Sequence, residues 1–262
     1  MPEISVIMGI YNCAATLQEA LDSLYAQTFK DFEIIMCDDG SQDETYEVAS
    51  RNAAEHSNIV LLKNESNLGL NATLNRCLQV AKGRYVARMD GDDLSKPLRF
   101  EVEHGFLEAH PEYAIVSTSM EYFDQEGVFR TGHCSGEPRK EAFVKGTPFC
   151  HAPCMVRREA YVAVGGYSVS KRLLRVEDYH LWLKMYDKGY RGYNLDNPLY
   201  MMRDDRNAVG RRKFKYRVNE AYVKYLVCRT FRLPLKYYIY CLKPIIVAIL
   251  PKCIYVRMHR NS

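Results

Sequence analysis

Short apolar runs alternate with helical patterns over the first 95 residues. Four runs predict buried β-strands, at residues 4–8, 33–37, 59–62 and 85–89. Between the first two, Leu17, Leu21 and Leu24 recur at the spacing of one helix face, and Leu70, Leu74 and Leu78 do so before the fourth. Strand, helix and strand in this order predict βαβ units, and so a mostly parallel sheet flanked by helices.

Later patterns are shorter and more mixed. Strands are predicted at 114–117 and 154–156, a hairpin-like segment around 124–127, and an amphipathic helix over 176–187. Beyond Arg211 the chain is predicted to be helical and basic. Ligands of such sheets bind beyond the carboxyl ends of the strands, so the residues that follow each strand are the candidates for a ligand site.

Composition places the chain among folded globular proteins and shows a marked charge asymmetry. With 262 residues, 47% hydrophobic and 26% charged, it is not a disordered, collagenous or coiled-coil protein. Residues 206–262 hold 14 Lys/Arg and one acidic residue, a net charge of +13, whereas residues 1–205 carry −9. A basic terminal quarter favours an anionic partner, either a membrane or a nucleic acid. The nine cysteines follow no framework spacing and are expected to be reduced.

Residues 233–250 form the most apolar segment of the basic quarter. Pro234, Lys236, Lys243 and Pro244 interrupt it, which disfavours a spanning helix. The flanking cations suit a segment that lies in a lipid headgroup region; they are Arg229, Arg232, Lys252, Arg257 and Arg260. The alternative is a helix docked on the rest of the protein or buried in a dimer. The first residues, Met1 to Ile4, do not resemble a secretory signal, so a cytoplasmic protein is expected.

Acidic clusters follow two of the predicted strands. Asp38 and Asp39 come after the second strand, and Asp90, Asp92 and Asp93 come after the fourth. All should open onto one crevice, where clustered carboxylates are costly unless a cation or a donor-rich ligand binds. The pair at i and i+2 in residues 90–93 suits a hard divalent cation, with Mn²⁺ or Mg²⁺ expected. A solvated turn or a helix cap is the simpler alternative.

Two further groups of residues allow both a chemical and a structural interpretation. Asp39 could accept a hydrogen bond from a nucleotide base on which Tyr11 stacks, or it could belong only to a turn. Glu177 and Asp178 open a predicted helix, where acidic residues complement the helix dipole. One of them could instead act as a general base.

Five motifs in order resemble those of the family 2 glycosyltransferases. They are residues 5–12, 38–41, 67–69, 90–93 and 177–179, and the resemblance covers roughly residues 3–205. The similarity is to enzymes of bacterial capsule, exopolysaccharide and lipopolysaccharide assembly. It implies the α/β GT-A fold, with a catalytic domain at 1–205 divided into a nucleotide-binding half (1–95) and an acceptor-binding half (96–205). Residues 206–262 would then be a basic helical extension.

The same resemblance implies roles for individual residues. Tyr11 and Asp39 correspond to uracil-binding positions, Asp90 and Asp92 to a DxD motif that holds the donor through a divalent metal, and Asp178 to the catalytic base. Contacts to the donor phosphates, or support for the main residues, are expected from a second set: Arg88, Asp93, Glu177, Arg211 and Arg212.

The implied reaction is an inverting transfer of a sugar from a UDP-sugar to a glycan acceptor. The acceptor is expected to be polyprenyl-pyrophosphate-linked, which would place the enzyme peripherally on the inner face of the plasma membrane and leave nucleic acid without a role. A sugar-phosphate nucleotidyltransferase is the enzymatic alternative. A non-enzymatic nucleic-acid-binding module that uses the basic quarter is the other.

Overall fold

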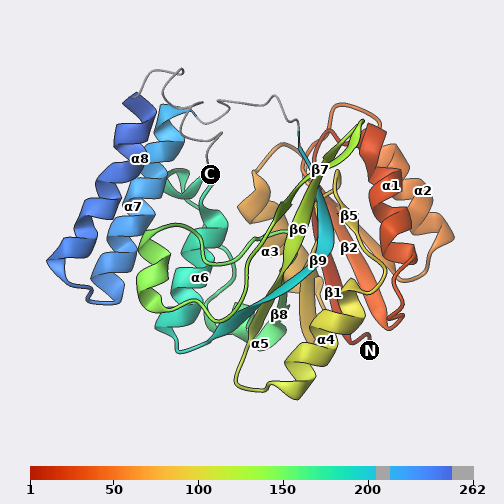
Figure 1. Cartoon of the computed structure of the whole chain (residues 1–262). Coiled ribbons are helices and arrows are strands. Elements are labelled where there is room, and N and C mark those ends of the chain that lie inside the picture. The colour runs from red at the N-terminus through yellow and green to blue at the C-terminus, as the bar shows by residue number, and fades with distance from the viewer. Residues whose placement is uncertain (205–212, 250–262) are drawn as a thin grey trace.

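The computed structural model describes residues 1–204 and 213–249, and Figure 1 shows a sheet with helices on both faces. The strands are β1 (Ile4–Ile10), β2 (Phe32–Asp38), β3 (Ile59–Lys63), β4 (Tyr85–Arg88), β5 (Leu94–Ser95), β6 (Ile115–Asp124), β7 (Gly127–Gly132), β8 (Met155–Arg157) and β9 (Gly192–Arg203). The α-helices are α1 (Ala14–Tyr25), α2 (Thr45–Glu55), α3 (Leu70–Val80), α4 (Arg99–Ala109), α5 (Arg158–Ala163), α6 (Glu177–Asp187), α7 (Phe214–Thr230) and α8 (Ile239–Ile249). Short 3₁₀ turns are η1 (Lys140–Val144), η2 (Lys171–Leu173) and η3 (Leu235–Tyr238).

The sheet is mixed and rich in parallel pairs, which confirms the predicted fold class. Its strand order is β3-β2-β1-β4-β8-β6-β9-β5, and β7 pairs with β6. The four strands predicted in the first 95 residues are β1 to β4, and they pair in parallel. β8 runs antiparallel to both β4 and β6, whereas β6 and β9 are parallel.

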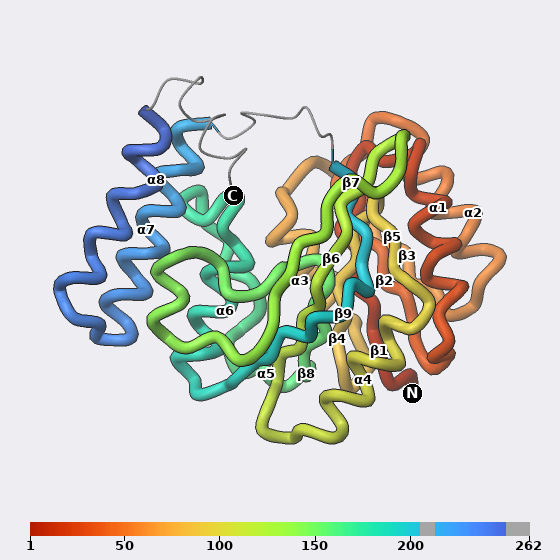
Figure 2. Tube along the Cα trace, viewed as in Figure 1, coloured from red at the N-terminus to blue at the C-terminus, as the bar shows by residue number. Residues whose placement is uncertain are grey.

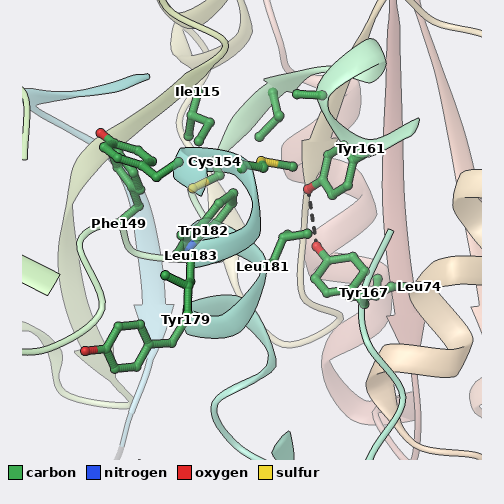
Figure 3. Packing of buried hydrophobic residues seen from close by; sticks show 14 of the residues in the cluster. Leu74, Ile115, Phe149, Cys154, Tyr161, Tyr167, Tyr179, Leu181, Trp182 and Leu183 are labelled. Carbon is green, nitrogen blue, oxygen red and sulfur yellow. Dashed lines mark hydrogen bonds between the residues drawn. The ribbon is translucent and has the colours of Figure 1, made fainter. Parts of the chain in front are cut away.

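Alternate residues of the central strands fill two hydrophobic cores. Ile7 and Ile35 face a core that α3, α5, α6 and α7 cover, whereas Val6 and Met8 face one that α1, α2 and α4 cover. Burial on both faces explains why these strands appear in the sequence as continuous apolar runs. In the first core, the Trp182 ring of α6 packs edge-on against Phe149 with the centroids 5.6 Å apart (Figure 3).

Strand β9 is absent from the prediction, and β6 is longer than predicted. β9 holds twelve residues, among them Asn194 and Pro198, and it lies between β6 and β5 (Figure 2). Its register against β6 shifts on both sides of Ser119. These irregularities remove the period-2 alternation that a sequence pattern needs, so pairing with β6 and not local preference makes this segment a strand. The predicted hairpin is confirmed, because β6 and β7 pair antiparallel and meet at Asp124 and Gly127.

The basic quarter contributes two helices. In α7, the buried Val223 and Val227 join the first core, and α8 packs on the outer side of α7, at the left edge of Figure 1. The docked helix that was the alternative for residues 233–250 is therefore present. Within the described ranges, no helix combines the length and the apolarity needed to cross a membrane. The expected domain boundary at 205–206 lies outside the described residues.

A fully buried ion pair within α4 lies against the carboxyl end of β4. Arg99 and Glu103 both have no exposed side-chain surface, and Arg99 Nε donates to Glu103 Oε2 at 3.2 Å. Burial raises the pKa of Glu103 to about 7, although Arg99 opposes this rise. Arg99 Nη2 also donates to the carbonyl oxygens of Arg88, Ala152 and Cys154 at 3.0–3.3 Å. The guanidinium thus holds the end of β4 next to the segment that leads into β8.

Replacement of Glu103 should be costly because it leaves the Arg99 charge buried without a counter-charge. We expect Glu103→Ala to lower the free energy of unfolding at pH 8 by about 3–5 kcal/mol, measured by urea denaturation. The control is Glu101→Ala, an exposed residue of α4 that accepts one hydrogen bond from Thr28 at 2.6 Å, and it should lower this free energy by about 1 kcal/mol or less. Equal effects of the two substitutions would contradict a special role for the buried pair.

Candidate active site

Three turns at the carboxyl ends of β1, β2 and β4 are hydrogen-bonded to one another. Asn12 N donates to Ser41 Oγ at 3.0 Å, and Gln42 N donates to Asn12 Oδ1 at 2.9 Å. Thr16 Oγ1 donates to the Gly91 carbonyl at 2.9 Å. Gly91 lies so close to the first turn that a Cβ there would be 2.7 Å from Cys13 Sγ. The three turns therefore meet at one edge of the sheet, as predicted, but residues 90–93 do not line the cavity that holds Tyr11 and Asp39.

A cavity of about 250 Å³ lies at this edge. Tyr11 and Asp39 line it, as do Asn67, Gly69 and Glu177. Tyr11 is 45% exposed, which leaves its ring free to stack on a ligand. The two residues that were expected to bind a base therefore share one cavity.

The Asp39 carboxylate is nearly saturated by the protein. Its Oδ1 accepts from Asn64 Nδ2 at 2.7 Å and from the Leu68 amide at 2.8 Å, and its Oδ2 accepts from the Gly69 amide at 2.9 Å. A carboxylate has about four acceptor positions, so these three bonds leave room for one further donor on Oδ2. One N–H of a base would fill it.

The aspartates of residues 90–93 have three different environments. Arg88 holds Asp90 through two hydrogen bonds of 2.7 and 2.5 Å. Asp93 is buried and accepts from the Tyr200 hydroxyl at 2.9 Å and from the Arg203 amide at 2.7 Å, which ties the turn to β9. Burial, followed by the charges of Asp90 and Asp92, raises the pKa of Asp93 to about 8. Asp93 therefore supports the fold of the turn.

Asp92 is the exposed carboxylate of this turn. Its backbone carbonyl accepts from Arg203 Nε at 2.9 Å, and the residue is exposed. Partial desolvation, with the Asp90 charge as a second cause, raises the pKa of Asp92 above its ordinary value. A bound cation would reverse that effect, because opposite charge favours the ionised carboxylate.

Arg88 is buried beneath the turn and not exposed toward the cavity. It is 4% exposed, and its Nε has no hydrogen-bond partner in the described residues. The half-buried His151 lies nearby; desolvation and the charge of Arg88 lower its pKa well below the usual value. His151 Nε2 contacts the Tyr167 hydroxyl at 2.7 Å, and Tyr167 contacts Tyr161 at 3.2 Å (Figure 3). With a neutral imidazole beside it, Arg88 has Asp90 as its paired counter-charge.

Glu177 and Asp178 are adjacent in α6 but face different cavities. Glu177 lines the cavity that holds Tyr11, whereas Asp178 lines a second cavity of about 360 Å³ together with Thr147. Thr147 Oγ1 lies 3.4 Å from Asp178 Oδ2. Burial raises the pKa of both carboxyl groups, and for Glu177 the charge of Asp178 adds to the rise. Each is thus a stronger base when ionised than an exposed carboxylate.

The residues of the acidic turn fit a divalent cation only with help from a ligand. In the described part of the chain, three potential ligand atoms come together only at Glu3, His104 and Glu108. That group lies at the opposite end of β1, and Arg84 already pairs with both glutamates. The turn offers Asp92, with Asp90 held beside it by Arg88. Mn²⁺ and Mg²⁺ sites commonly combine one or two carboxylates with substrate phosphates, and this donor set suits them.

Two residues that line the cavities belong to none of the five sequence motifs, and two predicted site residues lie outside the described part of the chain. Arg175 and Tyr216 line both cavities, and nothing in the sequence pattern marks them. Arg211 and Arg212, which were expected near the phosphates, lie outside the described residues.

Comparison with known proteins identifies the family. The family model described as Glycosyl transferase family 2 matches residues 5–165, more than half of the chain. The chain therefore belongs to glycosyl transferase family 2, as its motifs predicted, and is a glycosyltransferase. This result favours a transferase over the nucleotidyltransferase alternative.

Individual relatives extend the match over almost the whole chain. The putative glycosyltransferase EpsE of Bacillus subtilis is 45% identical over 261 residues, which are 99% of this chain and 94% of EpsE. The Escherichia coli UDP-Glc:alpha-D-GlcNAc-diphosphoundecaprenol beta-1,3-glucosyltransferase WfaP is 31% identical over 225 residues, 85% of this chain and 86% of WfaP. S. aureus TarS in complex with UDP-GlcNAc superposes with a TM-score of 0.71 at 18% identity, covering 95% of this chain and 72% of that one. The fold is the predicted GT-A fold.

Asp92 provides a test of the cation site. We expect Asp92→Asn to lower the affinity for UDP in the presence of Mn²⁺ by about 10–100-fold, the range seen when even an outer-shell partner of a metal site is lost. Binding without Mn²⁺ should change little. Calorimetric titration of both proteins measures the difference, with the exposed Asp187→Asn on α6 as control. Unchanged UDP affinity in Mn²⁺ would contradict the assignment of Asp92.

Proposed function

We propose that this glycosyltransferase transfers a sugar from a UDP-sugar to a lipid-linked glycan acceptor, with inversion, in bacterial surface polysaccharide synthesis. The observation that carries this proposal is the pair of adjoining cavities. One is lined by Tyr11 and Asp39, and the other by Asp178. A transferase needs room for a donor and an acceptor on either side of the bond that is exchanged, and two cavities that share Arg175 and Tyr216 in their walls supply it.

The donor side is proposed to bind the nucleotide. Tyr11 offers a ring for stacking, and Asp39 Oδ2 has an unused acceptor position for one N–H of uracil. Asp90 and Asp92 belong to the turn that Thr16 ties to the start of α1, and they would hold a divalent cation that supplies positive charge to the departing UDP. TarS was solved with UDP-GlcNAc, and WfaP is named for a UDP-Glc donor, which supports the choice of UDP.

The acceptor side is proposed to use Asp178 as the general base. Its raised pKa makes the ionised carboxylate a better proton acceptor, and Thr147 orients one of its oxygens. The acceptor hydroxyl would lose its proton to Asp178 while its oxygen attacks the anomeric carbon from the side opposite UDP. One displacement of this kind inverts the anomeric centre, as it does in inverting glycosidases.

A panel of UDP-sugars, assayed by UDP release with a polyprenyl-diphosphate-linked acceptor, tests the function. We expect Asp178→Asn to lower kcat by about 10²–10⁴-fold with donor affinity near wild type, since only the base is removed. In the wild type, kcat should fall as the pH drops through the raised pKa of Asp178, because protonation removes the base. The kcat of Glu177→Gln, a matched substitution in the neighbouring cavity, is measured for comparison and should fall less. Near-normal kcat in Asp178→Asn would contradict the role of Asp178. If no acceptor of this class supports UDP release, the proposed function is contradicted.

We also propose that α8 holds the enzyme on an anionic membrane surface. Exposed apolar residues recur at helical spacing through η3 and α8: Leu235, Ile239, Leu242, Ile246 and Ile249. Lys236 and Lys243 are exposed beside these residues, and Arg229 and Arg232 are exposed nearby. Apolar residues flanked by cations suit the boundary between lipid headgroups and acyl chains. A lipid-linked acceptor of the kind in WfaP's name would be found there.

Substitutions on the outer face of α8 test membrane binding without disturbing the contact with α7. We expect Leu242→Glu with Ile246→Glu to abolish co-sedimentation with vesicles that contain anionic lipid. Lys236→Gln with Lys243→Gln should weaken it and reduce its salt dependence, at ~1 kcal/mol per charge. Val162→Glu, at another exposed apolar position, is the control. Equal sedimentation of all variants, or none by the wild type, would contradict the proposal.

A further inference from the structure

Arg175 lies in the wall between the two cavities. Of the described residues, only Arg175 and Tyr216 line both. Asp178 is three positions further along the chain and lines the second cavity. A group bound by Arg175 would therefore lie close to the hydroxyl that Asp178 deprotonates.

Arg175 is also the basic residue of these walls that the protein leaves unused. No other Lys or Arg among the described residues lines either cavity. Nearby cations are engaged elsewhere: Arg88 pairs with Asp90, and Lys224 pairs with Glu220 at 3.4 Å. Arg175 is exposed, and no ion pair holds it within the part of the chain that the structure describes. Its guanidinium is thus free to bind an anion.

The backbone at Arg175 is in an unfavourable conformation. Its φ is +68°, in the left-handed region, where a residue with a long side chain is uncommon and glycine is preferred. The chain does place glycines at positive φ nearby, at Gly165 and Gly166. Such strain clusters at ligand-binding positions, where the surrounding structure holds it in place. At the junction of the two cavities a long side chain is present although glycine would suit this backbone better.

We propose that Arg175 binds the diphosphate of a monosaccharide-diphosphate lipid acceptor, an inference that rests on the proposed function. In such an acceptor the diphosphate and the attacked hydroxyl are carried by the same sugar ring. A cation and a base in the wall of one cavity match that arrangement. The donor diphosphate would be met by the acidic turn and a cation bound there, whereas Arg175 is the cation that the described residues offer on the acceptor side. A planar guanidinium also binds phosphate oxygens in a fork. Arg175 would thus select acceptors whose first sugar is being extended.

The test compares two lipid-linked acceptors that carry the same sugar, one with a diphosphate and one without it. One is a sugar linked through diphosphate to a short polyprenyl chain, and the other is the neutral alkyl glycoside of the same sugar. We expect Arg175→Ala to raise KM for the diphosphate acceptor by about 10–100-fold, as for a lost charge-assisted hydrogen bond. KM for the neutral glycoside and for the UDP-sugar should stay within twofold. Arg175→Lys should restore part of the effect.

Two further variants separate binding from folding. Arg172→Ala is the matched control, because Arg172 is exposed on η2 and lies over the Tyr222 ring, outside both cavities. Arg175→Gly relieves the unfavourable φ, so its thermal unfolding midpoint should not fall, while its preference for the diphosphate acceptor should be lost.

The possible results distinguish this inference from the function on which it rests. An unchanged KM for the diphosphate acceptor in Arg175→Ala, with an active wild type, would overturn the role of Arg175 alone. An increase confined to the KM of the UDP-sugar would overturn it as well, because it would assign Arg175 to the donor. A wild type that transfers to neither acceptor would contradict the proposed function.

Discussion

The crowding of negative charge in residues 90–93 is the constraint on which the candidate site depends. Three aspartates within four residues repel one another, and each carboxylate has a different environment in the fold. Asp90 is paired with the buried Arg88, and Asp93 is satisfied by the Tyr200 hydroxyl and a backbone amide of β9. Only Asp92 is left for solvent or a ligand. The protein thus neutralises or satisfies two carboxylates in order to present the third.

These environments require parts of the chain that are far apart in the sequence. Arg88 belongs to β4, its carbonyl is held by Arg99 of α4, and Asp93 is satisfied by β9. The first four strands were predictable because burial on both faces makes them continuous apolar runs. β9 was not, because Pro198 and the register shifts beside Ser119 break its alternation. The strand that completes the acidic turn is therefore one that a local pattern could not reveal.

The residues of the candidate site were predictable from the sequence, but their distribution between the two cavities was not. Strand ends in a parallel sheet share an edge, so the meeting of the turns that carry Tyr11, Asp39 and Asp92 followed from the strand order. Glu177 and Asp178 are neighbours in α6, and successive residues of an α-helix differ by about 100° in direction. Which of them faces which cavity depends on the rotation of α6 about its axis. Packing of Trp182 and its neighbours sets that rotation, and no motif records it.

The basic quarter shows how two interpretations of one segment can both have a physical basis. A helix that is apolar all around is expected in a core or a membrane, and α8 has partly buried residues such as Tyr240 and Cys241 on the side that packs against the protein. Docking on α7 accounts for that side alone. Ile239, Leu242 and Ile246 recur at helical spacing on the other side and remain exposed. Since docking does not explain the apolar outer face, the same helix can be fixed to the enzyme and still present a surface to lipid.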